Sequence, residues 1–251
     1  WPETVWNGIR VIRPLLNVSR CALRAALKRD GQGWLDDPSN ENDRFERVRI
    51  RRALRSADVA SLGGEAAAAL ARSRADAAAA QQWLSVHACV HGTGHITVPR
   101  GLLIGTRDEV ALRILSRLVH ACGGKTPERA EVMRILAALN ERGPFRRSLG
   151  GALIAARTGE VLLGREPGRI AAVAVGVPPG GLLWDGRFMI QAPAGFVLRP
   201  ALGRRHGGGR GLPAFVQEGL PVLENAAGRL VFPHFDREPG FGLQLGERFC
   251  L

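Results

Sequence analysis

The chain has 251 residues, 45% of them hydrophobic, and its 35 Lys and Arg against 23 Asp and Glu give a net charge of +12. This charge favours a polyanionic partner, nucleic acid first, although a genome rich in Arg, Ala and Gly codons would give the same bias. The four cysteines form no CxxC pair and no apolar run approaches the roughly 20 residues of a membrane span, which argues against a zinc ribbon, excludes a transmembrane helix and predicts a reduced, cytoplasmic location.

The first sixty residues predict two helices. Ser19 suits an N-cap and Gly31 a helix end, so the first helix is expected at residues 19–30. The second is expected to begin at Asp36-Asp37-Pro38 and to continue to about residue 56, because Asp suits a cap and Pro the first turn.

Residues 61–167 are expected to form a helical module that ends in a β-hairpin. Gly63-Gly64 predicts a break, and an Ala-rich helix is expected at 65–90. A short strand is expected at 96–99, and two further helices after Thr106-Arg107-Asp108-Glu109, which has the pattern of a capping box, and after Thr126-Pro127. The hairpin strands are expected at 152–156 and 161–163.

Residues 168–251 are rich in Gly and Pro and predict a small β-rich module. Short strands are expected at 188–190, 196–198 and 230–232. Gly207-Gly208-Gly209 lacks the Lys, the Ser and the strand–helix frame of a phosphate loop, so a flexible linker is expected there. The expected fold class is therefore α+β.

The densest chemical signal is a group of arginines on the second expected helix: Arg44, Arg47, Arg49, Arg51, Arg52 and Arg55. Arg44, Arg47, Arg51 and Arg55 would line one helix face, with Phe45 and Val48 packed inward. Guanidinium groups bind phosphate oxygens bidentately, so the row is a candidate nucleic-acid contact. A solvated face that pairs locally with Asp43 and Glu46 explains the pattern equally well. The carboxylates and the amide of residues 34–40 either cap the helix or orient an Arg or a substrate amine.

The order of these pieces is specific. Ile-Arg-Pro-Leu-Leu at 12–16 and Arg20 are followed by Gly-Trp-Leu-Asp-Asp-Pro-Ser-Asn at 33–40 and Phe-Glu-Arg-Val-Arg-Ile-Arg at 45–51. Together they resemble the stretch that follows the ATP-binding core in tRNA(Ile)-lysidine synthetases. The resemblance continues through 106–124, Ser-Leu-Gly-Gly at 148–151, Gly-Arg-Glu at 164–166 and Trp-Asp-Gly-Arg-Phe at 184–188.

The resemblance implies an enzyme that uses ATP, with Mg²⁺, to adenylate the wobble cytidine in the CAU anticodon of tRNA(Ile), after which lysine displaces AMP. Residues 1–60 would be the tail of the catalytic domain with a linking Arg-rich helix, 61–167 the substrate-binding domain, and 168–251 a tRNA-recognition domain. The implied partners are tRNA(Ile), lysine, ATP and a second copy of the chain, with no membrane. The family's Ser-Gly-Gly-x-Asp-Ser loop is absent from the sequence, so this chain is expected to supply tRNA binding, to bind no ATP and to be inactive alone.

The resemblance also implies the site residues, namely Arg13, Asp37, Asn40, Arg47 and Arg51, joined by Arg44 on the same helix face. Arg47 and Arg51 would touch the tRNA backbone or the mouth of the active site. Asp37 and Asn40 would hold the helix start, and Arg13 would lie where the catalytic domain ends. Val48 departs from the family, where Asn is frequent. The alternative is a free-standing or remnant basic RNA-binding module without catalysis.

One further cluster is open to two interpretations. His87, His91 and His95 recur every fourth residue around Cys89, a spacing that could hold a metal ion, but Gly92 and Gly94 would end a helix before the third histidine. Surface or packing histidines are the alternative.

Overall fold

The computed structural model describes residues 3–6, 9–15, 18–55, 59–141 and 143–251. The chain divides into two compact units, Trp1–Ala67 (unit 1) and Ala68–Leu251 (unit 2). The boundary falls within helix α3 (Val59–His87). Among the described residues, no helix is both long enough and apolar enough to cross a membrane.

Unit 1 opens with a two-stranded antiparallel ribbon, β1 (Glu3–Trp6) and β2 (Ile9–Ile12). Helix α1 (Arg20–Arg29) follows, and the Oγ of Ser19 caps it by accepting the N–H of Ala22 at 3.1 Å. The first helix expected from the sequence is thereby confirmed to within one residue at each end.

The second helix differs from its expectation. Asp37 and Pro38 begin a short 3₁₀ helix (Pro38–Glu41), and the α-helix, α2 (Glu46–Arg55), starts later. The Oδ1 of Asn42 accepts the N–H of Arg44 at 3.0 Å, which satisfies that donor in a local turn and competes with a continuous helix. Val48 is 3% exposed as expected, but Phe45 is 42% exposed, so its expected inward packing is wrong.

The expected break at Gly63-Gly64 is also wrong, because both residues lie within α3. A helix-interior Gly costs only about 1 kcal/mol relative to Ala, and the Ala-rich sequence that follows favours the helix strongly. The pair therefore does not stop the helix.

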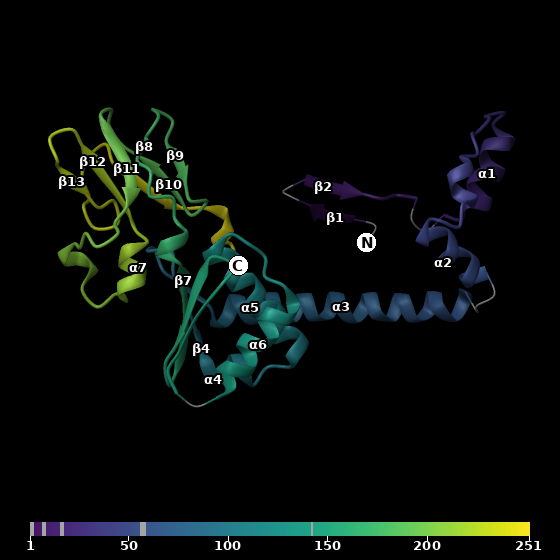
Figure 1. The fold of residues 1–251 in the computed structure, drawn as a ribbon, viewed down its shortest axis with the longest axis horizontal. Coiled ribbons are helices and arrows are strands. Elements are labelled where there is room, and N and C mark those ends of the chain that lie inside the picture. Colours follow the sequence, from purple (N-terminus) through teal and green to yellow (C-terminus); the bar gives the residue numbers. More distant parts are fainter. Residues whose placement is uncertain (1–2, 7–8, 16–17, 56–58, 142) are drawn as a thin grey trace. The chain divides into compact units, whose positions relative to one another are not determined.

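The helical half of unit 2 packs on one face of a five-stranded antiparallel sheet of order β3-β4-β7-β6-β5. Its strands are β3 (Cys89–Val90), β4 (Ile96–Pro99), β5 (Phe145–Leu149), β6 (Ala152–Ala156) and β7 (Glu160–Arg165). The helices are α4 (Arg100–Ile104), α5 (Asp108–Gly123) and α6 (Arg129–Asn140), which lie beside the sheet in Figure 1. Leu115 and Leu118 of α5 are fully buried with Ile154 and Leu163 of the sheet, so this contact is the main core. The expected hairpin is confirmed, and β5 adds a strand to it.

The capping box lies at a different helix from the one expected. Arg107 precedes α5 without a side-chain cap, whereas Glu128 and Glu131 form a capping box at the start of α6. The expected start of α6 after Thr126-Pro127 is confirmed.

Arg100 ties the end of α6 to the hairpin. Its side chain is 7% exposed, and its guanidinium donates to the carbonyl oxygens of Leu139 (2.9 Å), Glu141, Gly143 (3.0 Å) and Arg157 (3.2 Å). The last carbonyls of a helix have no partner within it, so Arg100 acts as the C-terminal cap of α6.

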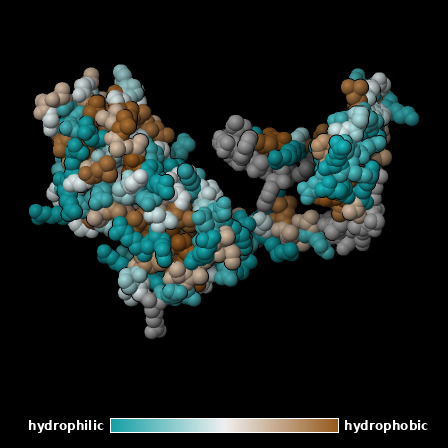
Figure 2. All heavy atoms as spheres, in the orientation of Figure 1, coloured by the Kyte–Doolittle hydropathy of each residue, from teal (hydrophilic) through white to brown (hydrophobic). Residues whose placement is uncertain are grey.

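The rest of unit 2 is β-rich, as the sequence predicts, and the α+β class is confirmed. Two antiparallel sheets, β14-β10-β9 and β13-β12-β11-β8, form it. Their strands are β8 (Val175–Gly176), β9 (Leu182–Trp184), β10 (Phe188–Gln191), β11 (Phe196–Pro200), β12 (Pro221–Asn225), β13 (Leu230–Val231) and β14 (Gly242–Leu245). Helix α7 (Ala214–Glu218) packs Phe215 and Val216 on Leu153 of β6, which joins the two halves of unit 2. On the face shown in Figure 2, hydrophilic residues surround smaller hydrophobic patches of unit 2.

The glycine run expected as a flexible linker is instead ordered. Gly207–Gly209 forms a 3₁₀ turn that His206 caps, and Gly209 is buried. A Cβ on Gly208 would lie 3.0 Å from the ring of Phe235. The glycine therefore lets the backbone pass close to this ring.

Candidate nucleic-acid interface

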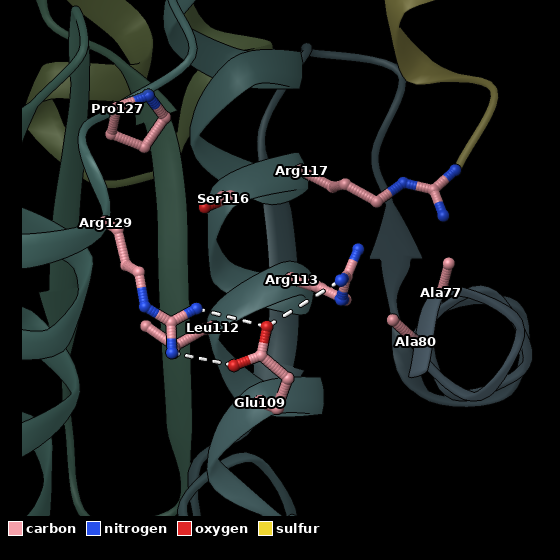
Figure 3. A pocket seen from close by; sticks show the side chains of 9 residues that line it. All are labelled: Ala77, Ala80, Glu109, Leu112, Arg113, Ser116, Arg117, Pro127 and Arg129. Carbon is pink, nitrogen blue, oxygen red and sulfur yellow. Dashed lines mark hydrogen bonds and ion pairs between the residues drawn. The ribbon is translucent and has the colours of Figure 1, made fainter. Parts of the chain in front are cut away.

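An arginine-lined groove crosses the helical half of unit 2. A cavity of about 400 Å³ lies between α3, α5 and the start of α6. Ala77 and Ala80 of α3 contribute only methyl groups, which leaves room beside the longer side chains of α5. In Figure 3, Arg113 and Arg117 extend from α5 toward α3, while Arg129 reaches Glu109 from the other side.

Three guanidinium groups and one carboxylate share this groove. Arg129 donates two hydrogen bonds to Glu109, from Nη1 to Oε1 at 3.1 Å and from Nη2 to Oε2 at 2.7 Å. The hydrogen bond from Arg129, together with the nearby positive charges, holds the pKa of Glu109 below its usual value. The same bond raises the pKa of Arg129. The groove is therefore positively charged at neutral pH.

Arg113 and Arg117 supply the charge that Glu109 does not neutralise. Arg113 Nη2 donates to the Oγ of Ser73 at 2.9 Å and lies 3.7 Å from Glu109 Oε1, while its buried Nε has no hydrogen-bond partner among the described residues. The side chain of Arg117 also makes no hydrogen bond or ion pair with any of the described residues. Two guanidinium groups one helical turn apart can hold successive backbone phosphates.

Unit 1 brings together some of the residues expected at the site. Asp37 accepts the N–H and the Oγ–H of Ser39, both at 2.8 Å, and Arg47 Nη2 donates to the same Oγ at 3.3 Å. The hydrogen bond from the Ser39 backbone is the main cause of the lowered pKa of Asp37, with its side-chain bond and the charge of Arg47 contributing less. The guanidinium of Arg47 also lies 4.8 Å from the centre of the Phe45 ring. Asp37, Ser39 and Arg47 thus form one small polar cluster.

The other expected residues are placed more loosely. Asn40 is half-buried in the 3₁₀ helix, Arg44 is exposed in the turn before α2, and Arg13 is exposed just after β2. Arg51 lies in α2, but its side chain falls outside the described residues. Because α2 begins at Glu46, the four-arginine row does not start within the helix.

Asp36 organises a second polar cluster that sequence reasoning assigned only in general terms. Its Oδ1 accepts hydrogen bonds from Arg20 Nη2 at 2.8 Å and from Arg24 Nη2. Arg24 also lies over the ring of Trp34, 5.3 Å from its centre. One carboxylate thus holds two arginines of α1, while Asp37 caps the 3₁₀ helix, so both arrangements considered for residues 34–40 occur.

The histidines of the sequence cluster pack against neighbouring side chains. His91 and His95 stack on each other, and among the described residues no group of three or more His, Cys, Asp or Glu side chains is placed to hold a metal ion.

Comparisons with known proteins place the chain. A family model described as a PP-loop domain matches residues 2–57. The tRNA(Ile)-lysidine synthase of Ruegeria pomeroyi is 33% identical over 200 residues, 76% of this chain and 46% of that protein. The one from Hyphomonas neptunium is 36% identical over 188 residues (72% and 47%), and the one from Rhizobium meliloti 31% identical over 244 (95% and 52%). The chain belongs to the tRNA(Ile)-lysidine synthase family.

The chain spans about half the length of the curated lysidine synthases it matches. All of the residues expected at the site lie within the PP-loop match, namely Arg13, Asp37, Asn40, Arg44, Arg47 and Arg51. The groove residues Arg113, Arg117 and Arg129 lie outside that match but inside the longer similarity to lysidine synthases from Rhizobium meliloti and others.

Proposed function

We propose that the protein takes part in the ATP-dependent modification of tRNA(Ile), with these 251 residues supplying much of the grip on the tRNA. The observation that carries the proposal is the similarity to lysidine synthases over as much as 95% of the chain. The net charge of +12 and the arginine groove support it, because a folded tRNA must be held along its phosphate backbone.

In the proposed reaction, the C2 carbon of the wobble cytidine in a CAU anticodon is activated with ATP, and lysine then forms the new C–N bond as AMP leaves. ATP, Mg²⁺ and lysine enter through the family alone, and no residue is assigned to them. A second copy of the chain is part of the proposal on the same basis. The three-part organisation into 1–60, 61–167 and 168–251 likewise stays a prediction.

Binding measured across a salt series tests the proposal. The purified chain is titrated with tRNA(Ile) carrying a CAU anticodon and with the similar methionine tRNA, from about 50 to 200 mM salt. Tighter binding of tRNA(Ile), with a slope that corresponds to several phosphate contacts, supports recognition by these residues. Equal and weak binding of both tRNAs that vanishes near physiological salt would contradict the proposal and favour a basic module without selectivity.

The residues predicted in unit 1 have their own test. We expect the double substitution Arg47→Ala with Arg51→Ala to weaken tRNA binding and to lower the salt slope by about two phosphate contacts. The matched control is Arg29→Ala with Lys28→Ala, which removes the same charge from the last turn of α1. Equal effects of the two double variants would mean that only net charge matters.

A further inference from the structure

The sheet face opposite α5 and α6 carries a cavity that the proposed function leaves unused. Four residues at one register cross this face, Arg146 on β5, Ala155 on β6, Leu162 on β7 and Thr97 on β4. Directly paired residues in adjacent strands point to the same side of a sheet. The row therefore forms a floor with a guanidinium at one edge, apolar groups in the middle and a hydroxyl at the far side.

The cavity above this floor measures about 480 Å³ and has two walls. One wall is the segment Gly211–Phe215 at the start of α7. Phe215 packs on Gly164, where a Cβ would come within 2.8 Å of the ring. The missing side chain at Gly164 therefore allows this wall to pack directly on the sheet. The volume lies within the range of ordinary small-molecule sites.

Two stacked imidazoles form the other wall. The rings of His91 and His95 are 4.1 Å apart at their centres, with 2° between their planes. Thr97 Oγ1 lies 3.0 Å from His91 Nε2, and Thr93 Oγ1 lies 2.7 Å from His95 Nδ1, which fixes both rings. His95 is 5% exposed, and burial, with the neighbouring His91, lowers its pKa to about 4. One face of the His91 ring is covered by His95, and His91 itself is half-buried and lines the cavity.

The rim carries positive charge. Arg146 is exposed, with its guanidinium 5.7 Å from the centre of the Phe215 ring, and Arg157 is exposed at the cavity as well. Neither side chain makes an ion pair within the described part of the chain, and Glu160 is the single carboxylate that lines the cavity. An anionic group therefore finds two guanidinium groups at the entrance.

A flat ring wall, an apolar floor and a cationic rim match the three parts of a nucleotide. Bases stack on aromatic side chains whatever their sequence, and guanidinium groups bind phosphate bidentately. We propose that this cavity, the His91–Arg146 pocket, binds one unpaired nucleotide of RNA, with the base against His91 and over Ala155 and Leu162, and the phosphate at Arg146 and Arg157. The inference rests on the proposed function, since it assumes that the RNA is the bound tRNA. A base held in a duplex is stacked on both faces and would not enter.

The test uses the whole chain and a short unstructured RNA that carries one 2-aminopurine. Stacking on His91 is expected to quench the fluorescence of this base analogue. We expect His91→Ala to weaken binding between about fivefold and a hundredfold and to abolish the quenching, and His91→Phe to restore both. Arg146→Gln should weaken binding without removing the quenching at saturation.

Arg147→Gln is the matched control, because Arg147 lies on the same strand and pairs with the buried Ile154, on the opposite face of the sheet. An equal effect of Arg146→Gln and Arg147→Gln, or unchanged quenching in His91→Ala, would overturn the pocket. Inorganic phosphate and free adenosine serve as competitors, and displacement by AMP at lower concentration than by either supports a site for a whole nucleotide.

The inference and the proposed function can fail separately. If tRNA binds with its expected salt slope while His91→Ala changes nothing, the pocket is wrong and the proposed function stands. If the short RNA quenches normally while tRNA(Ile) and methionine tRNA bind equally and weakly, the pocket stands as a nucleotide site and the proposed function is wrong.

Discussion

The Nε of Arg165 lies 2.8 Å from the Oδ2 of Asp185, and this contact joins β7 of the five-stranded sheet to the β-rich half of unit 2. Asp185 also accepts a bond from Arg187 Nε at 2.7 Å, and Arg187 is only 2% exposed. Arg165 donates as well to the carbonyl oxygens of Gly123, Gly151 and Arg169. One largely buried carboxylate thus balances two guanidinium groups where the two halves meet.

Asp185→Ala should lower the free energy of unfolding by about 3 to 5 kcal/mol, because it leaves the buried guanidinium of Arg187 and the largely buried one of Arg165 without their carboxylate. Urea titration followed by circular dichroism measures the change. The control is Glu238→Ala, which breaks the exposed pair with Arg229 and should cost less than about 1 kcal/mol. Asp185→Asn, which tolerates the left-handed φ of 50°, separates charge from backbone strain. Similar losses for Asp185→Ala and Glu238→Ala would refute a special role for the buried pair.

Gly123→Ala should destabilise the protein by about 3 kcal/mol or more, as overpacking against backbone atoms allows no relief. A Cβ at Gly123 would lie 2.3 Å from the Gly150 carbonyl oxygen and 2.5 Å from the Ala152 nitrogen, where α5 touches the turn between β5 and β6. Gly101→Ala in α4 meets nothing within 4 Å and should stabilise slightly, by about 0.5 to 1 kcal/mol. Thermal melting of both variants measures these changes in stability. An unchanged stability of Gly123→Ala would mean that helix α5 can shift away from the turn.

Stability should fall as the pH drops from about 6.5 toward 4, because two buried histidines resist protonation. Burial, and to a lesser extent Arg187, lowers the pKa of His234 to about 4, and burial and His91 do the same for His95. Unfolded histidine takes up a proton near pH 6.5, so acid favours the unfolded state by up to about 3 kcal/mol for each group. His234→Phe keeps the edge-to-face contact with Phe188 but cannot titrate. Urea midpoints between pH 5 and 7, above the range of the carboxylates, should therefore vary less steeply in this variant, and an unchanged dependence would contradict the assignment.

Cys122 should resist alkylation while the protein is folded. Burial raises the pKa of its thiol to about 12, whereas Cys21, Cys89 and Cys250 are exposed. Mass spectrometry after iodoacetamide treatment should find adducts at the three exposed positions in buffer and at all four in denaturant. Rapid modification of Cys122 in buffer would mean that the contact of α5 with the sheet opens readily.

The double substitution Arg113→Gln with Arg117→Gln should weaken tRNA binding and lower the salt slope by about 2, because two phosphates would no longer be neutralised. Arg134→Gln on α6 is exposed and does not line the groove, so it should change the slope by less. Far-ultraviolet circular dichroism checks that the double variant stays folded. Equal slopes for the double variant and the wild type would remove the groove from the interface.

Local patterns predicted the elements whose signals are local. Strand β4 and helix α5 matched expectation because an apolar alternation and a long apolar stripe mark them directly. Asp37-Pro38 did start a helix, but a 3₁₀ one, since the side chain of Asn42 bonds to the backbone N–H of Arg44 and competes with a continuous helix. Strands such as β12, which starts with Pro221, carried no such signal and depend on their neighbours in the sheet.

The candidate sites likewise divide into residues that are neighbours in the sequence and residues that only the fold brings together. The arginines of residues 44–55 were visible in the sequence because they are neighbours along the chain. Arg113, Arg117 and Arg129 come together only through the packing of α5 with α6, although the spacing of Arg113 and Arg117 by four residues was a signal that sequence reasoning missed. His91 and Arg146 are 55 residues apart, and only the folding of the sheet brings them to one cavity.

Arg100 couples the opening of helix α6 to the opening of the hairpin. Four carbonyl oxygens from two separate turns converge on a single side chain that itself begins α4. The end of α6 cannot fray without also releasing the turn of the hairpin, and the turn cannot open without exposing the buried guanidinium. Helices and sheet should therefore exchange their amide hydrogens as one cooperative body, in which local opening near residue 140 is as rare as opening of the strands.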